Sequence, residues 1–173
     1  MFGICNLAII PLRLEPSDRS EIVSQVLFGE HFVVLEELKQ WRRIKLQYDG
    51  YEGWVDSKQF QVSTEAAYNT LSNEAIVLNA DLIDYISAPN NTLIPIPLGA
   101  SLSFLNHSDI NTAHFEFEGA KTSGKQDKNK LINTAFLYLN APYLWGGKTP
   151  FGIDCSGFTQ MVYKLNGYHL FRD

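Results

Sequence analysis

The sequence predicts a mixed fold of β plus α/β type, in which one or two small β-barrels precede a helical segment that opens an α/β domain. Short apolar stretches separated by turn residues fill most of residues 1–120, a pattern typical of small barrels. A polar stretch rich in small residues follows at 119–130 and is typical of a linker. Beyond it, apolar residues recur at helical spacing. We therefore divide the chain into units at 1–62, 63–120 and 121–173.

The first unit consists of short strands and turns. The predicted strands lie at 8–13, 26–30, 31–36, 41–46 and 53–56. Between the last two stands Asp49-Gly50, a dipeptide that favours tight hairpin turns. No helical period of useful length occurs among these residues. We expect one small barrel.

The second unit repeats this β character less clearly. Apolar stretches alternate with turns rich in Asn, Pro and Gly, and they lie at 75–78, 82–86, 93–100 and 101–105. We interpret residues 63–120 as a second small barrel, although the two units cannot be aligned residue by residue.

The third unit contains two predicted helices. The first has Leu131, Ala135, Tyr138 and Leu139 on one face and stops at Asn140-Ala141-Pro142, because proline cannot continue a helix. The second has Asp154 as a candidate N-cap and Gly167 as a C-terminal stop. A Gly-rich turn region at 145–153 separates the two helices.

One face of the second predicted helix is apolar. It carries the residues Phe158, Met161, Val162 and Leu165 at positions i, i+3, i+4 and i+7. Such a face has to be buried against a partner surface. We expect a missing C-terminal segment or another chain to cover it.

Composition and charge exclude several classes of partner. The 173 residues are 45% hydrophobic with a mean hydropathy of −0.12 and a net charge of −5. No basic cluster exceeds Arg42-Arg43, so we expect no nucleic-acid partner. No stretch approaches the roughly 20 apolar residues that span a bilayer.

The N-terminal residues and the two cysteines give information about the cellular compartment of the protein. Residues 1–12 are apolar but lack a basic start and a small-residue cleavage site. We expect a cytoplasmic protein, or a periplasmic or extracellular one whose signal peptide has been removed. Two cysteines, Cys5 and Cys155, do not make a disulfide framework, and a disulfide between them is possible but not favoured. No metal and no cofactor are expected.

Cys155 is the candidate for chemistry. A thiol in the first turn of a helix lies at the positive end of the helix dipole, which favours the nucleophilic thiolate. Backbone N–H groups at the same end can stabilise an oxyanion. Glycines at 146, 147, 152 and 157 allow close approach of backbone or substrate. The alternative is that Cys155 is an ordinary small buried side chain.

The segment from Tyr143 to Phe158 resembles the signature of the NlpC/P60 cysteine endopeptidases. The shared residues are Tyr143, Trp145, Gly146, Gly147, Gly152 and the run Asp154-Cys155-Ser156-Gly157-Phe158. Residues 27–30, the strand at Trp41 and residues 49–55 resemble a bacterial SH3 domain. This resemblance implies SH3-like barrels followed by the helical first half of a papain-like NlpC/P60 domain.

The order of domains is similar to the subgroup that cuts γ-D-glutamyl–diamino acid bonds in murein peptides with a free N-terminal L-alanine. The resemblance implies a murein tripeptide or tetrapeptide as substrate and a role in cell-wall turnover. The alternative is a binding module for wall peptides, in which the Cys155 segment is vestigial.

The resemblance also implies site residues. Cys155 would be the nucleophile, Asp154 would hold the substrate amino terminus, Tyr143 would line the oxyanion side, and Ser156 would contact substrate. Tyr51 would form the wall contributed by the first barrel.

Glu15 is a second candidate for that wall. Each assignment has a structural alternative: Asp154 as a helix cap only, Tyr143 as a packing partner of Trp145, Tyr51 as a structural aromatic and Glu15 as a solvated turn residue. Trp145 itself is interpreted as core that supports the turn.

No histidine is placed to act as the base for Cys155. His169 lies beyond the end of the same helix, roughly 15–20 Å away at about 1.5 Å per residue. His31, His107 and His114 fall in the β units. Since the family places its histidine on a downstream strand, we expect a C-terminally truncated chain that lacks the catalytic histidine and is inactive alone.

Overall fold

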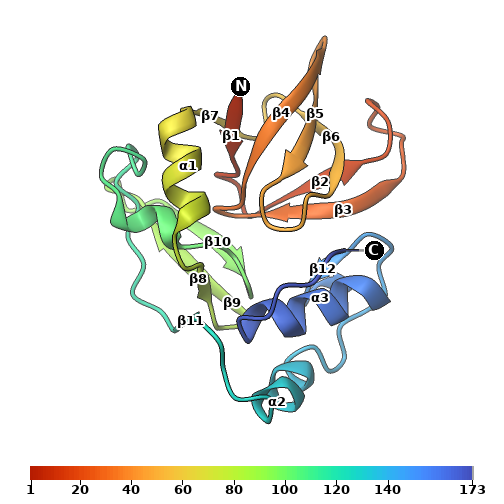
Figure 1. The fold of residues 1–173 in the computed structure, drawn as a ribbon, viewed down its shortest axis with the longest axis vertical. Coiled ribbons are helices and arrows are strands. Elements are labelled where there is room, and N and C mark those ends of the chain that lie inside the picture. Colours follow the sequence, from red (N-terminus) through yellow and green to blue (C-terminus); the bar gives the residue numbers. More distant parts are fainter. Residues whose placement is uncertain (173) are drawn as a thin grey trace.

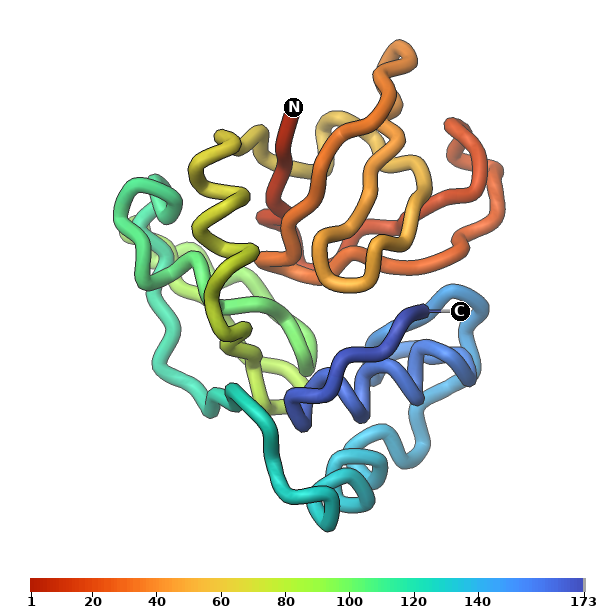
Figure 2. The backbone as a smooth tube through the Cα atoms, in the orientation of Figure 1, coloured from red at the N-terminus to blue at the C-terminus, as the bar shows by residue number. Residues whose placement is uncertain are grey.

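The computed structural model describes residues 1–172, so that Asp173 of the segment 171–173 lies outside the described residues. Figure 1 shows three parts: a curled sheet, a group of short strands with one helix beside it, and two further helices below them. Figure 2 traces the end of the chain back along the last helix, beneath the curled sheet. Among the described residues, no helix is both long enough and apolar enough to cross a bilayer.

The first 63 residues form one seven-stranded antiparallel sheet. Its strands are β1 (Phe2–Ile4), β2 (Ile9–Arg13), β3 (Ile22–Leu27), β4 (His31–Leu38), β5 (Trp41–Leu46), β6 (Glu52–Asp56) and β7 (Gln61–Ser63). They pair in the order β3-β2-β6-β5-β4-β1-β7. The β5–β6 hairpin turns at the predicted Asp49-Gly50, where Gly50 has φ +71°. The sheet confirms the predicted β character of this unit.

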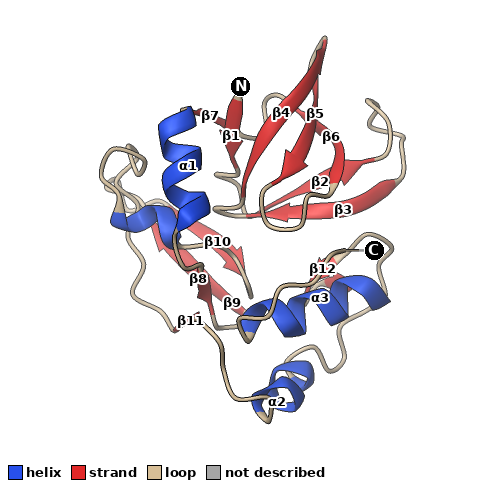
Figure 3. Cartoon of the chain, viewed as in Figure 1, coloured by secondary structure: helices blue, strands red, loops and turns tan. Residues whose placement is uncertain are grey.

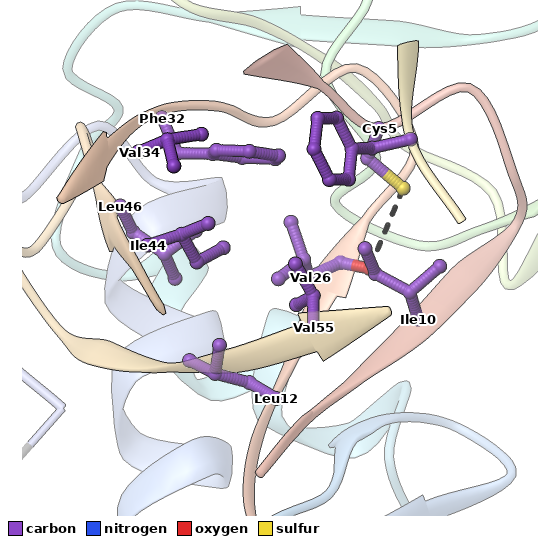
Figure 4. Close-up of a cluster of buried hydrophobic side chains, with 10 residues drawn as sticks. Cys5, Ile10, Leu12, Val26, Phe32, Val34, Ile44, Leu46 and Val55 are labelled. Atoms are coloured by element: carbon purple, nitrogen blue, oxygen red, sulfur yellow. Dashed lines mark hydrogen bonds between the residues drawn. The ribbon is translucent and has the colours of Figure 1, made fainter. Parts of the chain in front are cut away.

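The concave side of this sheet encloses a buried apolar core. It contains the residues Cys5, Ile10, Leu12, Val26, Phe32, Val34, Ile44, Leu46, Val55 and Phe60 (Figure 4). Within this core, Cys5 is fully buried and its Sγ lies 3.8 Å from the Val26 carbonyl oxygen. Burial raises the pKa of the Cys5 thiol to about 12. Both cysteines are free, so there is no disulfide between them.

The second part contains a helix that the sequence did not reveal. The helix α1 (Glu65–Asn73) begins after Thr64, whose hydroxyl accepts a hydrogen bond from the Ala67 N–H at 3.1 Å. Only Ala67 and Leu71 of this helix are buried. The sequence predicts no element at 65–73, because a short and mostly polar helix offers little apolar periodicity.

The remaining elements of the second part are short. They are β8 (Val77–Asn79), β9 (Ile83–Ser87), β10 (Leu93–Pro97), the 3-10 helix η1 (Ser103–Asn106) and β11 (Lys121–Ser123). β9 pairs with β10 and β8 pairs with β11, and isolated bridges join Leu78 to Ser101 and Ser87 to Glu116. The pairing of β11 with β8 continues past residue 120, and a second barrel in this part stays a prediction.

The third part contains the two predicted helices and a tight two-stranded turn. Its elements are α2 (Lys130–Phe136), β12 (Lys148–Thr149), β13 (Gly152–Ile153) and α3 (Cys155–Leu165), and Figure 3 distinguishes helices from strands. Asp154 is the N-cap of α3, and Gly167 follows its end with φ +76°, which confirms both predicted signals. The predicted apolar face of the first helix was wrong at Leu139, which lies beyond the end of α2 and is 66% exposed.

The apolar face of α3 is buried within the chain itself. Met161, Val162 and Leu165 are buried in a cluster that also holds Leu27 of β3, Leu78 of β8, Leu98, Tyr138 and Ile153. Phe158 remains 36% exposed and meets Tyr138 edge to face at 6.0 Å. The expectation that a missing segment or another chain covers this face was wrong for Met161, Val162 and Leu165, because α3 packs directly against the β units.

A buried ion cluster fixes the first sheet to the third part. The Glu30 carboxylate accepts from Lys164 Nζ at 2.6 Å and from Lys148 Nζ at 3.4 Å, and all three residues are buried. It also accepts from the Leu27 N–H at 2.8 Å. Burial acts to raise the pKa of Glu30, but the two ammonium groups and the hydrogen bonds outweigh it and lower the pKa to about 2.

Further hydrogen bonds reinforce the same interface. Gln160 of α3 donates to Asp49 at 2.7 Å, and the Lys148 N–H donates to the Gln25 side chain at 2.7 Å. The Tyr48 hydroxyl donates to the Tyr168 carbonyl at 3.3 Å. Together these contacts set the position of α3 relative to the sheet.

Candidate active site

Cys155 lies in a pocket of about 380 Å³ between the first sheet and the start of α3. One wall comes from the sheet and the other from the segment around α3. The lining residues are Glu21, Val23, Tyr51, Trp145, Asp154, Cys155, Ser156 and Arg172. The pocket is thus formed by two parts of the chain that lie more than 90 positions apart in the sequence.

Two glycines let the Gly-rich turn come this close to the sheet and the helix. Gly146 has φ +75°, and a Cβ there would lie 2.3 Å from the Ile22 carbonyl oxygen of β3. At Gly157 a Cβ would lie 2.2 Å from the Gly147 carbonyl oxygen. Neither position can hold a larger residue without a backbone shift, so the sequence pattern of glycines has a steric cause here.

Cys155 is the first residue of α3 and is exposed. The dipole of the helix directs its positive end toward this thiol, whereas Cys5 is enclosed by apolar side chains. Of the two cysteines, Cys155 alone is placed to react with a molecule from solvent. The reading of Cys155 as a small buried side chain does not fit its exposure.

Asp154 holds the Gly-rich turn and the helix start together. Its Oδ1 accepts from the Gly157 N–H at 2.7 Å, and its Oδ2 accepts from the Gly146 N–H at 2.8 Å. Arg172 donates to both oxygens at 2.7 Å. Burial acts to raise the pKa of Asp154, but the hydrogen bonds and charge of Arg172 and the backbone donors lower it. Asp154 is therefore an ionised carboxylate whose two oxygens have partners within the chain.

Ser156 and Tyr51 also line the pocket, as predicted. The Ser156 hydroxyl accepts from Arg172 Nη1 at 2.9 Å. Tyr51 packs partly against the core of the first sheet, and its backbone N–H donates to Asp49 Oδ1 at 3.0 Å. The first sheet thus contributes an aromatic side chain to the wall opposite Cys155.

Two predicted residues do not line this pocket. Glu15 is exposed in the β2–β3 loop, where its N–H donates to the Ser20 hydroxyl. Tyr143 is 68% exposed and bridges to Ile153 through its backbone. The assignment of Glu15 to the wall was wrong in position, because the acidic residue that the loop brings to the pocket is Glu21.

Four of the lining residues were not predicted as site residues, namely Glu21, Val23, Trp145 and Arg172. Trp145, interpreted as core, is 59% exposed, and its indole N–H donates to Glu21 Oε1 at 2.5 Å. Arg172 lies at the end of the described chain and is 2% exposed. Glu21 belongs to no motif, and only the register of β3 against the Gly-rich turn places it here, so sequence alone carried no signal for it.

None of the four histidines, all of which are described, lines the pocket. His31 contacts Ser72, and burial lowers its pKa to about 4. His107 bonds Glu74 at 2.9 Å, and His169 contacts the Tyr48 carbonyl oxygen. His114 lies in a turn with φ +51°. Residues 1–172 also contain no group of three or more acidic, His or Cys side chains arranged to hold a metal ion.

Comparison with protein families gives two matches along the chain. Residues 12–60 match the bacterial dipeptidyl-peptidase Sh3 domain, and residues 140–173 match the NlpC/P60 family. The first match covers most of the first sheet, and the second covers the Gly-rich turn, Cys155 and α3.

Curated relatives align with nearly the whole chain. A gamma-D-glutamyl-L-lysine dipeptidyl-peptidase from Bacillus cereus is 27% identical over 91% of this chain and 54% of its own length. Dipeptidyl-peptidase 6 from Lysinibacillus sphaericus is 27% identical over 94% of this chain and 68% of its own length. The gamma-D-glutamyl-L-lysine dipeptidyl-peptidase of Bacillus subtilis is 29% identical over 88% and 56%. The chain therefore spans just over half the length of two of these relatives.

Solved structures share the fold. An NlpC/P60 family protein from Bacillus cereus superposes with a TM-score of 0.79 at 20% identity, covering 100% of this chain and 75% of that chain. An NlpC/P60 endopeptidase from Photobacterium damselae subsp. piscicida gives a TM-score of 0.69 at 17% identity, covering 99% and 44%. The fold of this chain is therefore shared with both structures.

Proposed function

Because the chain belongs to the NlpC/P60 family and has a bacterial dipeptidyl-peptidase SH3 domain before its Cys155 segment, we propose that it is part of a cysteine peptidase of the cell wall. The bond cleaved is the γ-D-glutamyl bond to a diamino acid, in a murein tripeptide or tetrapeptide with a free N-terminal L-alanine. The names of the aligned relatives support this substrate class.

One observation carries the proposal: an exposed cysteine at a helix N-terminus faces a pocket whose other wall is the SH3-like sheet. A pocket of about 380 Å³ is near the lower end of the range for small-ligand sites. It suits a short peptide better than a folded protein or a long glycan strand.

The charges of the pocket favour a free amino terminus in the substrate. Glu21 places a carboxylate on the sheet side, and one of its oxygens accepts from the Trp145 indole. The Asp154 carboxylate is already shared between Arg172 and two backbone N–H groups. We therefore assign the substrate ammonium to Glu21 in the first place, with Tyr51 beside it, and we give Asp154 the role of holding Cys155 in position.

The chemistry follows from the thiolate. Its sulfur attacks the γ-carbonyl carbon of D-glutamate, the C–N bond breaks, and the departing amine takes up a proton. Water then hydrolyses the thioester and returns the thiol. Backbone donors at the start of α3 are suited to stabilise the oxyanion. A base within hydrogen-bond reach of the thiol is also required, and we assign none of the described histidines to that role.

The substrate assignment is tested by binding, which does not depend on turnover. Calorimetric titration of the chain with L-Ala-γ-D-Glu-L-Lys is expected to give saturable binding, and the N-acetylated peptide is expected to bind at least about tenfold more weakly, because it lacks the charge that Glu21 attracts. The variant Glu21→Gln should weaken binding of the free peptide. Glu15→Gln is the matched control, because Glu15 lies in the same loop but outside the pocket, and it should bind as the wild type does. Equal binding of the free and acetylated peptides would contradict the assignment.

A binding module without cleavage is the second candidate, favoured by the contribution of the SH3-like sheet to the pocket wall. Thiol reactivity separates the two. A peptidase nucleophile should label with iodoacetamide at pH 7 faster than a free thiol peptide, whereas a vestigial cysteine should label no faster.

A further inference from the structure

The guanidinium of Arg172 is buried against both neighbours of Cys155, although Arg172 lies 17 positions after Cys155 in the sequence. The segment after α3 turns at Gly167 and runs back along the helix. The Tyr168 N–H donates to the Tyr163 carbonyl at 3.0 Å, and Gln160 donates to the Leu170 carbonyl at 3.2 Å. These contacts return Arg172 to the start of α3, where it is 2% exposed.

Arg172 binds the residues on both sides of Cys155. Its Nη1 donates to Asp154 Oδ1 at 2.7 Å and to Ser156 Oγ at 2.9 Å, and its Nη2 donates to Asp154 Oδ2 at 2.7 Å. This is a two-pronged guanidinium–carboxylate pair, which is both strong and geometrically specific. A lysine in its place could supply the charge but not the fork.

The space for this contact is built into the helix start. A Cβ at Gly157 would lie 2.9 Å from Arg172 Nη1 and 3.0 Å from Asp154 Oδ1. A side chain at this position would therefore press on the ion pair as well as on the Gly-rich turn. The first turn of α3 is shaped to accept the guanidinium.

The charge balance beside the thiol depends on this residue. Asp154 directly precedes Cys155, and a carboxylate next to a thiol disfavours the thiolate. Arg172 is the one cation among the residues that line the pocket, all of which are described. The buried ammonium groups of Lys148 and Lys164 are paired with Glu30 instead.

We propose that Arg172 is a positioning residue for the nucleophile: it fixes both neighbours of Cys155 and neutralises Asp154, so that the thiolate can form at the helix start. This role deepens the proposed function, since it concerns the same cysteine. It acts through Asp154 and Ser156 and requires no contact between Arg172 and substrate.

The test is the pH dependence of iodoacetamide labelling of Cys155, with labelling at each cysteine quantified by mass spectrometry of the peptides. In Arg172→Met the unpaired Asp154 carboxylate should move the labelling midpoint upward by about one pH unit and lower the rate at pH 7 roughly tenfold. Arg172→Lys should give a smaller shift. The exposed loop residue Arg19 provides the matched control, and Arg19→Met should label as the wild type does.

The double variant Asp154→Asn/Arg172→Met separates charge from structure. Removing both charges should return the midpoint to within about 0.3 pH unit of the wild type, even though the hydrogen bonds of the pair are lost. If Arg172 only supported the fold, the double variant would label no better than the single one. Should Arg172→Met not fold, the comparison of Arg172→Lys with Asp154→Asn/Arg172→Lys takes its place, with the same expected direction.

Two results would overturn the inference. One is a labelling midpoint that is unchanged in folded Arg172→Met, and the other is a double variant whose labelling midpoint does not return toward that of the wild type. Failure of the proposed function has a different signature. A chain that binds no murein peptide but keeps the Arg172-dependent midpoint would refute the substrate and leave the role of Arg172 standing. Normal peptide binding with a labelling midpoint independent of Arg172 would refute the role of Arg172 and leave the substrate assignment standing.

Discussion

The substitution Glu30→Gln removes one negative charge from the buried interface and leaves two ammonium groups there. Glu30 pairs with Lys164 at 2.6 Å and Lys148 at 3.4 Å, and none of the three side chains is more than 6% exposed. Glutamine keeps an oxygen that can accept from the Leu27 N–H. The change therefore isolates the loss of charge from the loss of the turn's hydrogen bond.

The expected cost is large because the two ammonium groups are left without a counter-charge. Breaking a buried ion pair by removing one partner typically costs about 3–5 kcal/mol. That is a substantial part of the roughly 5–15 kcal/mol that holds a domain folded. We expect Glu30→Gln to lower the free energy of unfolding by about 3–5 kcal/mol.

Lys148→Met is the matched control. It removes the ammonium at the longer distance and keeps an apolar stem of similar length, while Glu30 retains Lys164 at 2.6 Å. Because the Glu30–Lys164 pair stays intact, Lys148→Met leaves no buried ion without a counter-charge, so we expect the free energy of unfolding to change by no more than about 1 kcal/mol.

Urea denaturation followed by tryptophan fluorescence measures both variants, since Trp41 and Trp54 lie in the first sheet and Trp145 lies at the interface. A loss below about 1 kcal/mol for Glu30→Gln, or a larger loss for Lys148→Met than for Glu30→Gln, would refute the reasoning.

Three further predictions follow from the packing and charge of the same structure. Met161→Ala should lower the free energy of unfolding by about 2–5 kcal/mol, since Met161 is fully buried and its truncation leaves a cavity. Phe158→Ala, at a partly exposed position, should lower it clearly less. Equal losses for the two variants in urea denaturation would contradict the described packing of α3. Gly146→Ala should lower the free energy of unfolding by at least about 1 kcal/mol, because Gly146 has a positive φ and a Cβ there would meet the Ile22 carbonyl oxygen. The variant should also bind the murein peptide more weakly in calorimetry. Unchanged stability and binding would argue against the close approach of the turn to β3. Glu30 should also make the free energy of unfolding depend on pH, because its pKa falls from 4.5 to about 2 on folding. Its contribution of about 3 kcal/mol is present above pH ~4.5 and is lost as the pH falls toward 2. Acid titration of Glu30→Gln, followed in the same way, should lack this component.

The local signals in the sequence predicted the elements that depend on local chemistry. Asp154 as N-cap and Gly167 as a stop define α3 through capping and a positive φ, which are properties of single positions. The strands of the first sheet follow from short apolar stretches separated by turn residues and from the Asp49-Gly50 turn. The helix α1 was missed because only Ala67 and Leu71 are buried, so that its apolar period is too weak to see.

The site could be predicted only where its residues belong to one contiguous segment. Cys155, Asp154 and Ser156 stand together, and all three line the pocket. Glu21 and Arg172 reach it through the register of β3 and through the return of the chain after α3, neither of which is visible in a linear sequence. For the same reason the partner of the α3 apolar face could not be foreseen, since it is supplied by Leu27, Leu78 and Leu98 from distant strands.

The most direct measurement is the rate of iodoacetamide labelling of Cys155 relative to Cys5, with and without saturating L-Ala-γ-D-Glu-L-Lys. We predict rapid labelling at Cys155, negligible labelling at Cys5 in the folded chain, and at least about tenfold protection of Cys155 by the peptide. Equal labelling of the two cysteines, or labelling of Cys155 that the peptide leaves unchanged, would contradict a reactive thiol in a peptide pocket walled by the SH3-like sheet.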